Sequence, residues 1–287
     1  MRYVTFEHAG RVRPGLLAGD SVEPLLGCAS LLEFVGLDAD ARASVLLEAP
    51  LPLSDVKLLA PIRPHKNVFC VGRNYLGHAE EVAKARGIEL KLPPVPTFFT
   101  KAPTSIADPG QVLHFSGELS VQYDWEAELA VVIGTRCKDV PESDALGVIF
   151  GYTCLNDVTA RDLQQQHLQW FKGKSLDEAC PIGPWIVSAD EIPDPQALEV
   201  SLSVNGERKQ YAPTAQMIFS VAAIIASLSR GMTLEPGDII ATGTPDGVGF
   251  ARTPPEFLHD GDEMSIEISG IGTLRNRVAV SAPVAAS

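Results

Sequence analysis

The strongest constraint on the fold of this chain is a group of acidic residues at the ends of two apolar segments. Glu126 and Glu128 lie on either side of one residue and lead into the apolar run 129–133. Because side chains alternate between the two faces of a strand, both glutamates should project from the same face. A second apolar segment, 147–155, is followed closely by Asp157. If the two strands are neighbours, three carboxylates meet at one end of a buried sheet.

Three carboxylates in one place repel each other and are costly to remove from water, so such a group is expected to hold a cation. Oxygen ligands alone favour Mg²⁺ or Mn²⁺ over Zn²⁺, with Ca²⁺ as an alternative in a crystal. Asp124 follows the same alternation and is a candidate either for a fourth member of the group or for a residue that supports its members from behind. The alternative is that these acids are only the solvated ends of two strands, where acidic residues are common.

The charge of the chain excludes some classes of partner. The formal net charge is -13, from 36 acidic residues against 23 Lys and Arg in 287 residues. Such an acidic surface repels phosphate backbones, so nucleic acid is not expected as a partner. An anionic substrate therefore needs a local positive site, such as a metal with a few Lys or Arg.

The compartment follows from the termini, the apolar runs and the cysteines. The N-terminal residues lack the apolar core of a signal peptide, and the longest apolar candidate, 219–228, is too short to span a membrane. Five scattered cysteines, an odd number, are typical of buried thiols in a reducing compartment. We expect a cytoplasmic protein that does not bind membranes.

The pattern of short segments predicts a mixed α/β fold that is mainly β. Residues 1–60 are expected to form a small β-rich N-terminal domain, with a proline-containing linker at 59–64 and a catalytic domain over 61–287. The expected strands are 2–8, 12–18, 67–72, 126–134, 147–155, 200–204, 263–269 and 273–280, and the expected helices are 30–35, 38–47, 77–86 and 216–229. Many strands with few helices favour a rolled mixed sheet over a doubly wound fold.

A histidine and a glutamate form a candidate proton-transfer pair. His78 and Glu81 are three residues apart in a predicted helix and hence share one face. In the functional interpretation, Glu81 fixes the imidazole and His78 takes a proton from water. The alternative is an exposed helix ion pair.

A lysine and a glycine-rich loop are further candidates. Lys174 follows a glycine, but Leu168 stands where a phosphate loop requires an earlier glycine, so that motif is excluded. Lys174 could instead stabilise an oxyanion beside a metal, or be solvated in a turn. The loop 242–249 could bring backbone close to a ligand with Thr244 donating a hydrogen bond, or be only a turn.

Taken together, these segments resemble the fumarylacetoacetate hydrolase family. The residues that carry the resemblance are Val-Gly-Arg-Asn-Tyr at 71–75, His78 and Glu81, Asp-Trp-Glu-Ala-Glu-Leu at 124–129, Asn-Asp-Val-Thr-Ala-Arg-Asp at 156–162, Gly-Lys-Ser at 173–175, Cys-Pro-Ile-Gly-Pro at 180–184, Val-Asn-Gly-Glu at 204–207, Pro-Gly-Asp at 236–238, and the loop 242–249. The match covers about residues 61–280 in order, and residues 1–60 resemble the N-terminal domain of the shorter family branch.

The resemblance implies a rolled mixed-sheet catalytic domain, a homodimer, and Mg²⁺ or Mn²⁺ bound by three acids. It also implies a lid that orders over the substrate. The implied metal ligands are Glu126, Glu128 and Asp157, the lid carries His78 and Glu81, and Lys174, Gln164 and Thr244 line the site. Arg73 and Lys101 are candidates for binding a substrate carboxylate, with a surface or structural role as the alternative.

The implied function is that of a metal-dependent hydrolase that cleaves a carbon–carbon bond of an acylpyruvate to pyruvate and a carboxylic acid. Its substrate would be a small anionic 2-oxo acid. The runner-up is decarboxylation of oxaloacetate or a related β-keto acid, or isomerisation or hydration of a dienoic 2-oxo acid, because one fold hosts several reactions. A module that binds metal or ligand without catalysis is the remote alternative.

Overall fold

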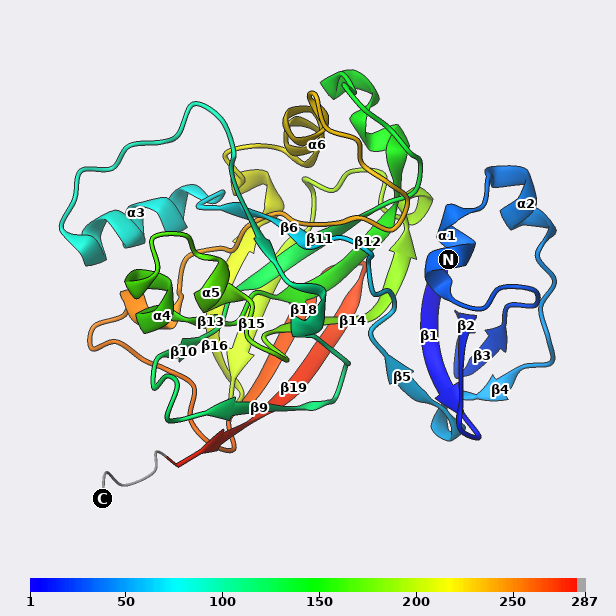
Figure 1. Ribbon diagram of the computed structural model, residues 1–287, viewed down its shortest axis with the longest axis horizontal. Coiled ribbons are helices and arrows are strands. Elements are labelled where there is room, and N and C mark those ends of the chain that lie inside the picture. Colours follow the sequence, from blue (N-terminus) through cyan, green and yellow to red (C-terminus); the bar gives the residue numbers. More distant parts are fainter. Residues whose placement is uncertain (283–287) are drawn as a thin grey trace.

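A large mixed sheet runs through the molecule in the computed structural model, which describes residues 1–282 (Figure 1). Its strand order is β4-β3-β2-β1-β14-β12-β11-β17-β6-β7, while β5 pairs with β1 and β8 pairs with β14. The strands are β1 Arg2–His8, β2 Arg11–Ala18, β3 Ser21–Pro24, β4 Leu51–Pro52, β5 Lys57–Leu59, β6 Val68–Gly72, β7 Thr97–Lys101, β8 Ile106–Ala107, β11 Ala127–Ile133, β12 Ile149–Asn156, β14 Cys180–Ser188 and β17 Ile239–Ala241.

A second sheet packs against the first and encloses the main core. It has five strands in the order β16-β15-β18-β19-β9, and a separate two-stranded ladder joins β10 to β13. The strands are β9 Val112–Ser116, β10 Tyr123–Asp124, β13 Thr159–Ala160, β15 Glu199–Val204, β16 Glu207–Pro213, β18 Glu263–Ile268 and β19 Gly272–Ser281. Leu129, Val131 and Ile133 of β11 face this core, and Ala130 and Val132 face a second apolar cluster on the other side. The central strand β11 is therefore buried on both faces.

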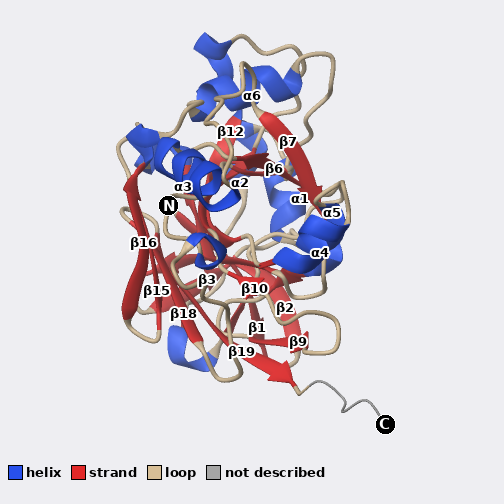
Figure 2. Ribbon diagram, turned by 90° about the vertical axis from the view of Figure 1, so that its left-hand side faces the viewer, coloured by secondary structure: helices blue, strands red, loops and turns tan. Residues whose placement is uncertain are grey.

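Six short α-helices in residues 1–282 cover the edges of the sheets (Figure 2). They are α1 Leu31–Gly36, α2 Ala39–Ser44, α3 Leu76–Arg86, α4 Arg161–Gln166, α5 Phe171–Lys174 and α6 Val221–Ser229. Helices α3, α4 and α5 gather on the side of the molecule away from the N-terminal strands. Helix α3 ends at Gly87, whose φ of 63° closes the last turn in the left-handed conformation that glycine tolerates. No helix of residues 1–282 is both long and apolar enough to cross a membrane.

The mainly β mixed fold expected from the sequence is confirmed, and two local expectations are corrected. Strand β14 was not predicted, because Pro181, Gly183 and Pro184 interrupt the strand pattern. Helix α6 starts at Val221 rather than at residue 216, because the Ser220 side chain accepts a hydrogen bond from the Ala223 amide and caps the helix there.

The expected linker at 59–64 is packed rather than loose. Ala60 and Ile62 are buried, and the Ala60 amide donates to the Asp108 carboxylate over 2.9 Å. The preceding strand β1 joins the central sheet through β14, with Tyr3 opposite Ile186. The N-terminal strands therefore extend the large sheet, and a domain boundary at residue 60 stays a prediction.

Candidate metal centre and active site

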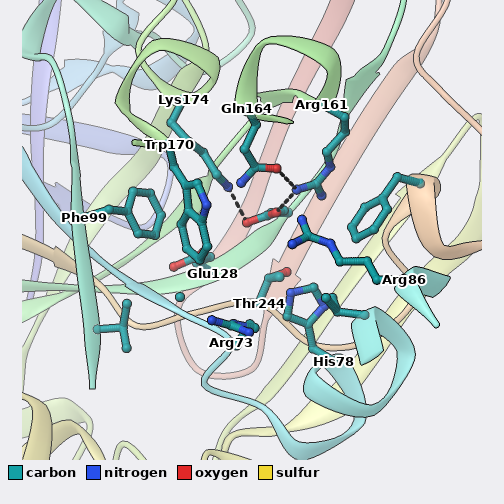
Figure 3. A pocket seen from close by; sticks show the side chains of 15 residues that line it. Arg73, His78, Arg86, Phe99, Glu128, Arg161, Gln164, Trp170, Lys174 and Thr244 are labelled. Carbon is teal, nitrogen blue, oxygen red and sulfur yellow. Dashed lines mark hydrogen bonds and ion pairs between the residues drawn. The ribbon is translucent and has the colours of Figure 1, made fainter. Parts of the chain in front are cut away.

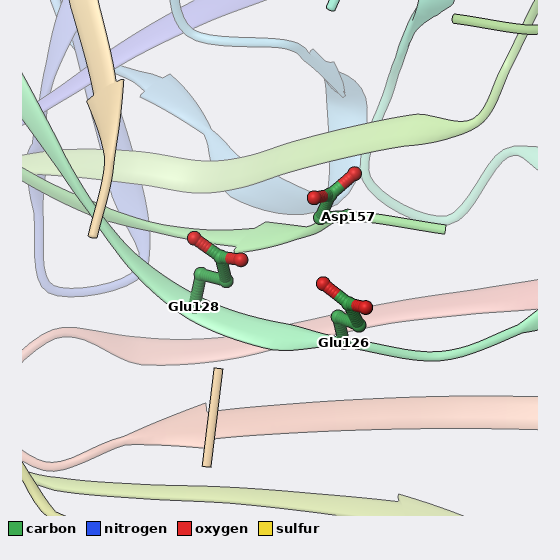
Figure 4. Close-up of side chains that lie close together, drawn as sticks. All are labelled: Glu126, Glu128 and Asp157. Atoms are coloured by element: carbon green, nitrogen blue, oxygen red, sulfur yellow. The ribbon is translucent and has the colours of Figure 1, made fainter. Parts of the chain in front are cut away.

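The three acids at the strand ends lie together in the structure (Figure 4). One carboxylate oxygen of each of Glu126, Glu128 and Asp157 lies within 4.8 Å of the others, and all three residues are buried. Strands β11 and β12 are antiparallel neighbours, and the Asp157 amide donates to the Glu126 carbonyl over 2.8 Å. The strand ends are thus fixed side by side, and alternation places both glutamates on one face.

Two of the three carboxylates have cationic partners inside the protein. Lys174 Nζ lies 2.7 Å from both Glu126 Oε2 and Asp157 Oδ2. Burial acts to raise the pKa of Glu126, but the charges of Lys174, Arg161 and His78 lower it to about 2. Burial acts to lower the pKa of Lys174, and the neighbouring carboxylates raise it instead, so Lys174 stays an ammonium at neutral pH.

The third carboxylate, that of Glu128, has a different environment. Its Oε2 accepts a hydrogen bond of 2.7 Å from the Gly243 amide, and no cation pairs with it among residues 1–282. Burial raises its pKa well above the ordinary value, and the charges of Asp157 and Glu126 raise it further. A divalent cation would relieve this repulsion, and a set of buried carboxylate oxygens suits Mg²⁺ or Mn²⁺.

The His78–Glu81 pair faces the same site. His78 Nδ1 lies 2.7 Å from Glu81 Oε1, and Glu81 Oε2 accepts a hydrogen bond of 2.8 Å from the Gly247 amide. The glycine-rich loop therefore holds Glu81, and Glu81 occupies Nδ1 of the imidazole. His78 lines the pocket, so its Nε2 is the nitrogen left to exchange a proton there.

Helix α3, which the family resemblance implies is a lid, contributes His78, Val82 and Arg86 to the pocket wall and packs closely against the glycine-rich loop. A Cβ atom at Gly77 would lie 2.5 Å from Asp246 Oδ1, so only glycine fits this contact without a shift. The pocket is partly open at its rim and has a free volume of about 30 Å³, which is room for about one or two water molecules. In this conformation the pocket has too little free space for a 2-oxo acid.

Three further predicted residues line this pocket: Arg73, Gln164 and Thr244 (Figure 3). Gln164 Oε1 accepts from Arg161 Nη1 over 3.1 Å, which leaves its amide nitrogen free to donate. Thr244 Oγ1 accepts from Gln210 Nε2 over 2.8 Å, so its own proton remains available.

Lys101 does not line the pocket, unlike the other predicted substrate-binding residues. It is fully buried, and its Nζ donates to Asp157 Oδ1 over 2.7 Å and to the carbonyls of Val158 and Lys174. These bonds use all three donors of the ammonium. We therefore assign Lys101 to holding Asp157 and correct its expected contact with a substrate carboxylate.

Arg161 is the main site residue whose role the sequence did not predict. Its Nη1 lies 2.7 Å from Glu126 Oε1 and its Nε lies 2.8 Å from Asp124 Oδ2. Asp124 also accepts from the amides of Gly249 and Phe250, so it anchors Arg161 and the glycine-rich loop and is not a fourth member of the acidic group. The position of Arg161 four residues after Asp157, at the start of a helix, was the available signal.

Comparisons with known proteins identify the family of this chain. Residues 67–279 match the family model for the C-terminal part of fumarylacetoacetate hydrolase, and residues 1–61 match the model called Rv2993c-like, N-terminal. The chain is 49% identical over 227 residues to oxaloacetate tautomerase YisK of Bacillus subtilis, covering 79% of this chain and 74% of that protein.

Solved structures show the same fold over nearly the whole chain. A fumarylacetoacetate hydrolase from Exiguobacterium antarcticum is 41% identical with a TM-score of 0.83, covering 98% of this chain and 100% of that one. A maleylpyruvate hydrolase from Sphingobium sp. SYK-6, in complex with manganese(II) and pyruvate, is 28% identical with a TM-score of 0.80 over 98% and 100% of the two chains. The chain belongs to the fumarylacetoacetate hydrolase family.

Proposed function

We propose that this protein is a metal-dependent enzyme that interconverts the keto and enol forms of a small 2-oxo acid of the oxaloacetate type. The observation that carries the proposal is the His78–Glu81 pair, whose imidazole lines the same pocket as Glu126 and Glu128 of the buried three-carboxylate group. Moving a proton between C3 and the 2-oxo oxygen needs one base and stabilisation of negative charge, and this pocket contains groups for both. The similarity to an enzyme named oxaloacetate tautomerase supports the same reaction.

Glu126, Glu128 and Asp157 would hold the ion, with Mg²⁺ and Mn²⁺ as the candidates. When bound, the ion would supply Lewis-acid stabilisation of the negative charge that develops on the 2-oxo oxygen. Lys174 holds Glu126 and Asp157 in place, and two of its three donors are used by those carboxylates. Its remaining donor is available to a substrate oxygen, because Lys174 also lines the pocket.

His78 performs the proton transfer in this proposal. Its Nε2 takes a proton from C3, the electron pair of the C3–H bond forms the C2=C3 double bond, and the 2-oxo oxygen receives the negative charge. Glu81 stabilises the imidazolium through Nδ1. Return of the same proton to the 2-oxo oxygen gives the enol, so no atom is gained or lost.

Hydrolysis of an acylpyruvate is the second candidate. The same pair could direct His78 Nε2 to a water molecule that attacks the distal carbonyl, with Lys174 as donor to the resulting oxyanion. The similarity to a maleylpyruvate hydrolase favours this reaction. Under both candidates we propose a cytoplasmic homodimer, as the family resemblance implies.

The deciding experiment follows oxaloacetate and an acylpyruvate with purified protein in Mg²⁺ or Mn²⁺, using enol absorbance and mass spectrometry of the products. We expect faster equilibration of keto and enol oxaloacetate, with the total amount of oxaloacetate unchanged. Conversion of the acylpyruvate to pyruvate plus a carboxylic acid would assign hydrolysis instead. Release of bicarbonate and pyruvate from oxaloacetate would assign decarboxylation.

A further inference from the structure

The pocket has a basic wall as well as an acidic one. Arg73, Arg86 and Arg161 line the same cavity as Glu126 and Glu128. Figure 3 shows the Arg86 side chain reaching into the pocket between His78 and Arg161. Arg86 belongs to the last turn of the lid helix α3, and helical side chains lean towards the N-terminus of their helix, which directs Arg86 back over the pocket.

The charge on this wall is only partly compensated. Within residues 1–282, Arg161 is the pocket arginine that pairs with acids, through Asp124 and Glu126. Arg161 Nη2 and Arg73 Nε are buried without a hydrogen-bond partner in the protein. Burial lowers the pKa of Arg86, and the positive charges of Arg73 and Arg161 lower it further. Unpaired buried donors and mutual repulsion are costly, and an anion bound among them would relieve both.

The three arginines are not equally free to bind that anion. Arg161 already uses Nε and Nη1 for acids and Gln164. Arg73 lies over the Trp170 ring, with its guanidinium carbon 5.9 Å from the ring centroid. Arg86 has no such partner among the described residues, and part of its side chain is exposed at the pocket rim. It is the guanidinium best able to form a new paired contact.

We propose that Arg86 selects the substrate by binding a second carboxylate, at the end of the molecule away from the 2-oxo group. The preferred substrates are then 2-oxo dicarboxylates, because a guanidinium pairs two donors with one carboxylate. This inference rests on the proposed function, in which the 2-oxo end lies at Glu126, Glu128 and Asp157. Since His78 and Arg86 share one helix, pairing of Arg86 with the substrate also draws the lid closed and seats His78.

The test compares oxaloacetate with its 4-methyl ester, which keeps the four-carbon skeleton and removes the distal charge by capping it with one methyl group. Exchange of the C3 proton in D₂O, followed by NMR, measures the reaction on both. We expect Arg86→Met to lower kcat/KM for oxaloacetate by about 10²-fold, through both a fall in kcat and a rise in KM. The same substitution should lower kcat/KM for the ester far less. Arg86→Lys should recover part of the loss. Lys84→Met, which removes an exposed cation from the same turn, is the control and should match the wild type.

A binding measurement separates this inference from the proposed function. Calorimetry in Mg²⁺ compares L-malate with L-lactate, which lacks the distal carboxylate. Tighter binding of malate by the wild type, lost in Arg86→Met, would support the role of Arg86 even if no 2-oxo acid were turned over. Equal affinities in the wild type, or equal losses on both substrates in Arg86→Met, would overturn it.

Discussion

The two walls of the pocket are built in different ways. The acidic wall stands on β11 and β12, two buried strands whose backbone pairing fixes Glu126, Glu128 and Asp157. The lid wall is one helix, α3, whose outward residues are exposed and which meets the glycine-rich loop through Glu81 and Gly77. Metal ligands must be placed precisely, whereas a lid must open for substrate. The difference predicts that changes in the acidic wall remove metal binding, while changes in the lid spare it.

The largest expected effect is that of Glu128→Gln. The substitution removes a charge that the ion needs, so activity should fall at least about 10³-fold, equal to about 4 kcal/mol. Thermal unfolding with and without Mg²⁺ should show that the stabilisation by the ion is lost. Glu118→Gln, at an exposed position, is the matched control. Full Mg²⁺ stabilisation in Glu128→Gln would refute the assignment of the acidic wall.

The second prediction tests whether the lid acts in proton transfer while the acidic wall alone binds the metal. His78→Gln should lower kcat by about 10²–10³-fold, because proton transfer by a positioned side chain contributes on that order. The rise in melting temperature caused by Mg²⁺ should stay at its wild-type size. If His78→Gln kept normal turnover, the role of the lid in proton transfer would be wrong.

The third effect concerns pH. The raised pKa of Glu128 means that this carboxyl holds a proton until the pH exceeds its folded pKa. Because Mg²⁺ must displace that proton, its affinity should rise with pH, by up to about tenfold per unit, until that pKa is passed. Without metal, the contribution of Glu128 to stability should decline as pH rises from its unfolded pKa of about 4.3 through the folded value. Melting curves over a pH series, with and without Mg²⁺, measure both trends, and Mg²⁺ stabilisation that shrank as pH rose would contradict them.

The smallest effect is that of Gly77→Ala. The added methyl group would press against the carboxylate of Asp246, a movable side-chain end, so we expect kcat/KM to fall only severalfold and stability to change by less than about 1 kcal/mol. Gly147→Ala, where the methyl group meets no atom within 4 Å, is the control. Asp246→Ala in the Gly77→Ala background should restore part of the activity. If it did not, the loss in Gly77→Ala would not come from contact with Asp246.

The sequence predicted those features that depend on residues close together in the chain. Strand alternation gave the shared face of Glu126 and Glu128, and the turn at Asn205 and Gly206 has the two positive φ angles expected of that pair. These features depend on residues that are close in the sequence.

Other features depend on packing between distant segments and were missed. Strand β14 forms despite Pro181 and Pro184, because β12 and β1 supply its neighbours. Lys101 is buried because β7 pairs with β6 and brings it behind Asp157. Arg86 reaches the pocket only because α3 folds back over the sheet, which no spacing in the sequence indicates.

The ammonium groups of Lys101 and Lys174 have a consequence for how the enzyme would respond to its surroundings. They act as built-in counter-ions that keep Asp157 in position whether or not a divalent ion is present. Loss of the ion should then leave a folded protein that can bind the ion again, instead of one that unfolds. Such an enzyme would be active in proportion to its ion supply, and its working level in a cell would track the free concentration of magnesium or manganese.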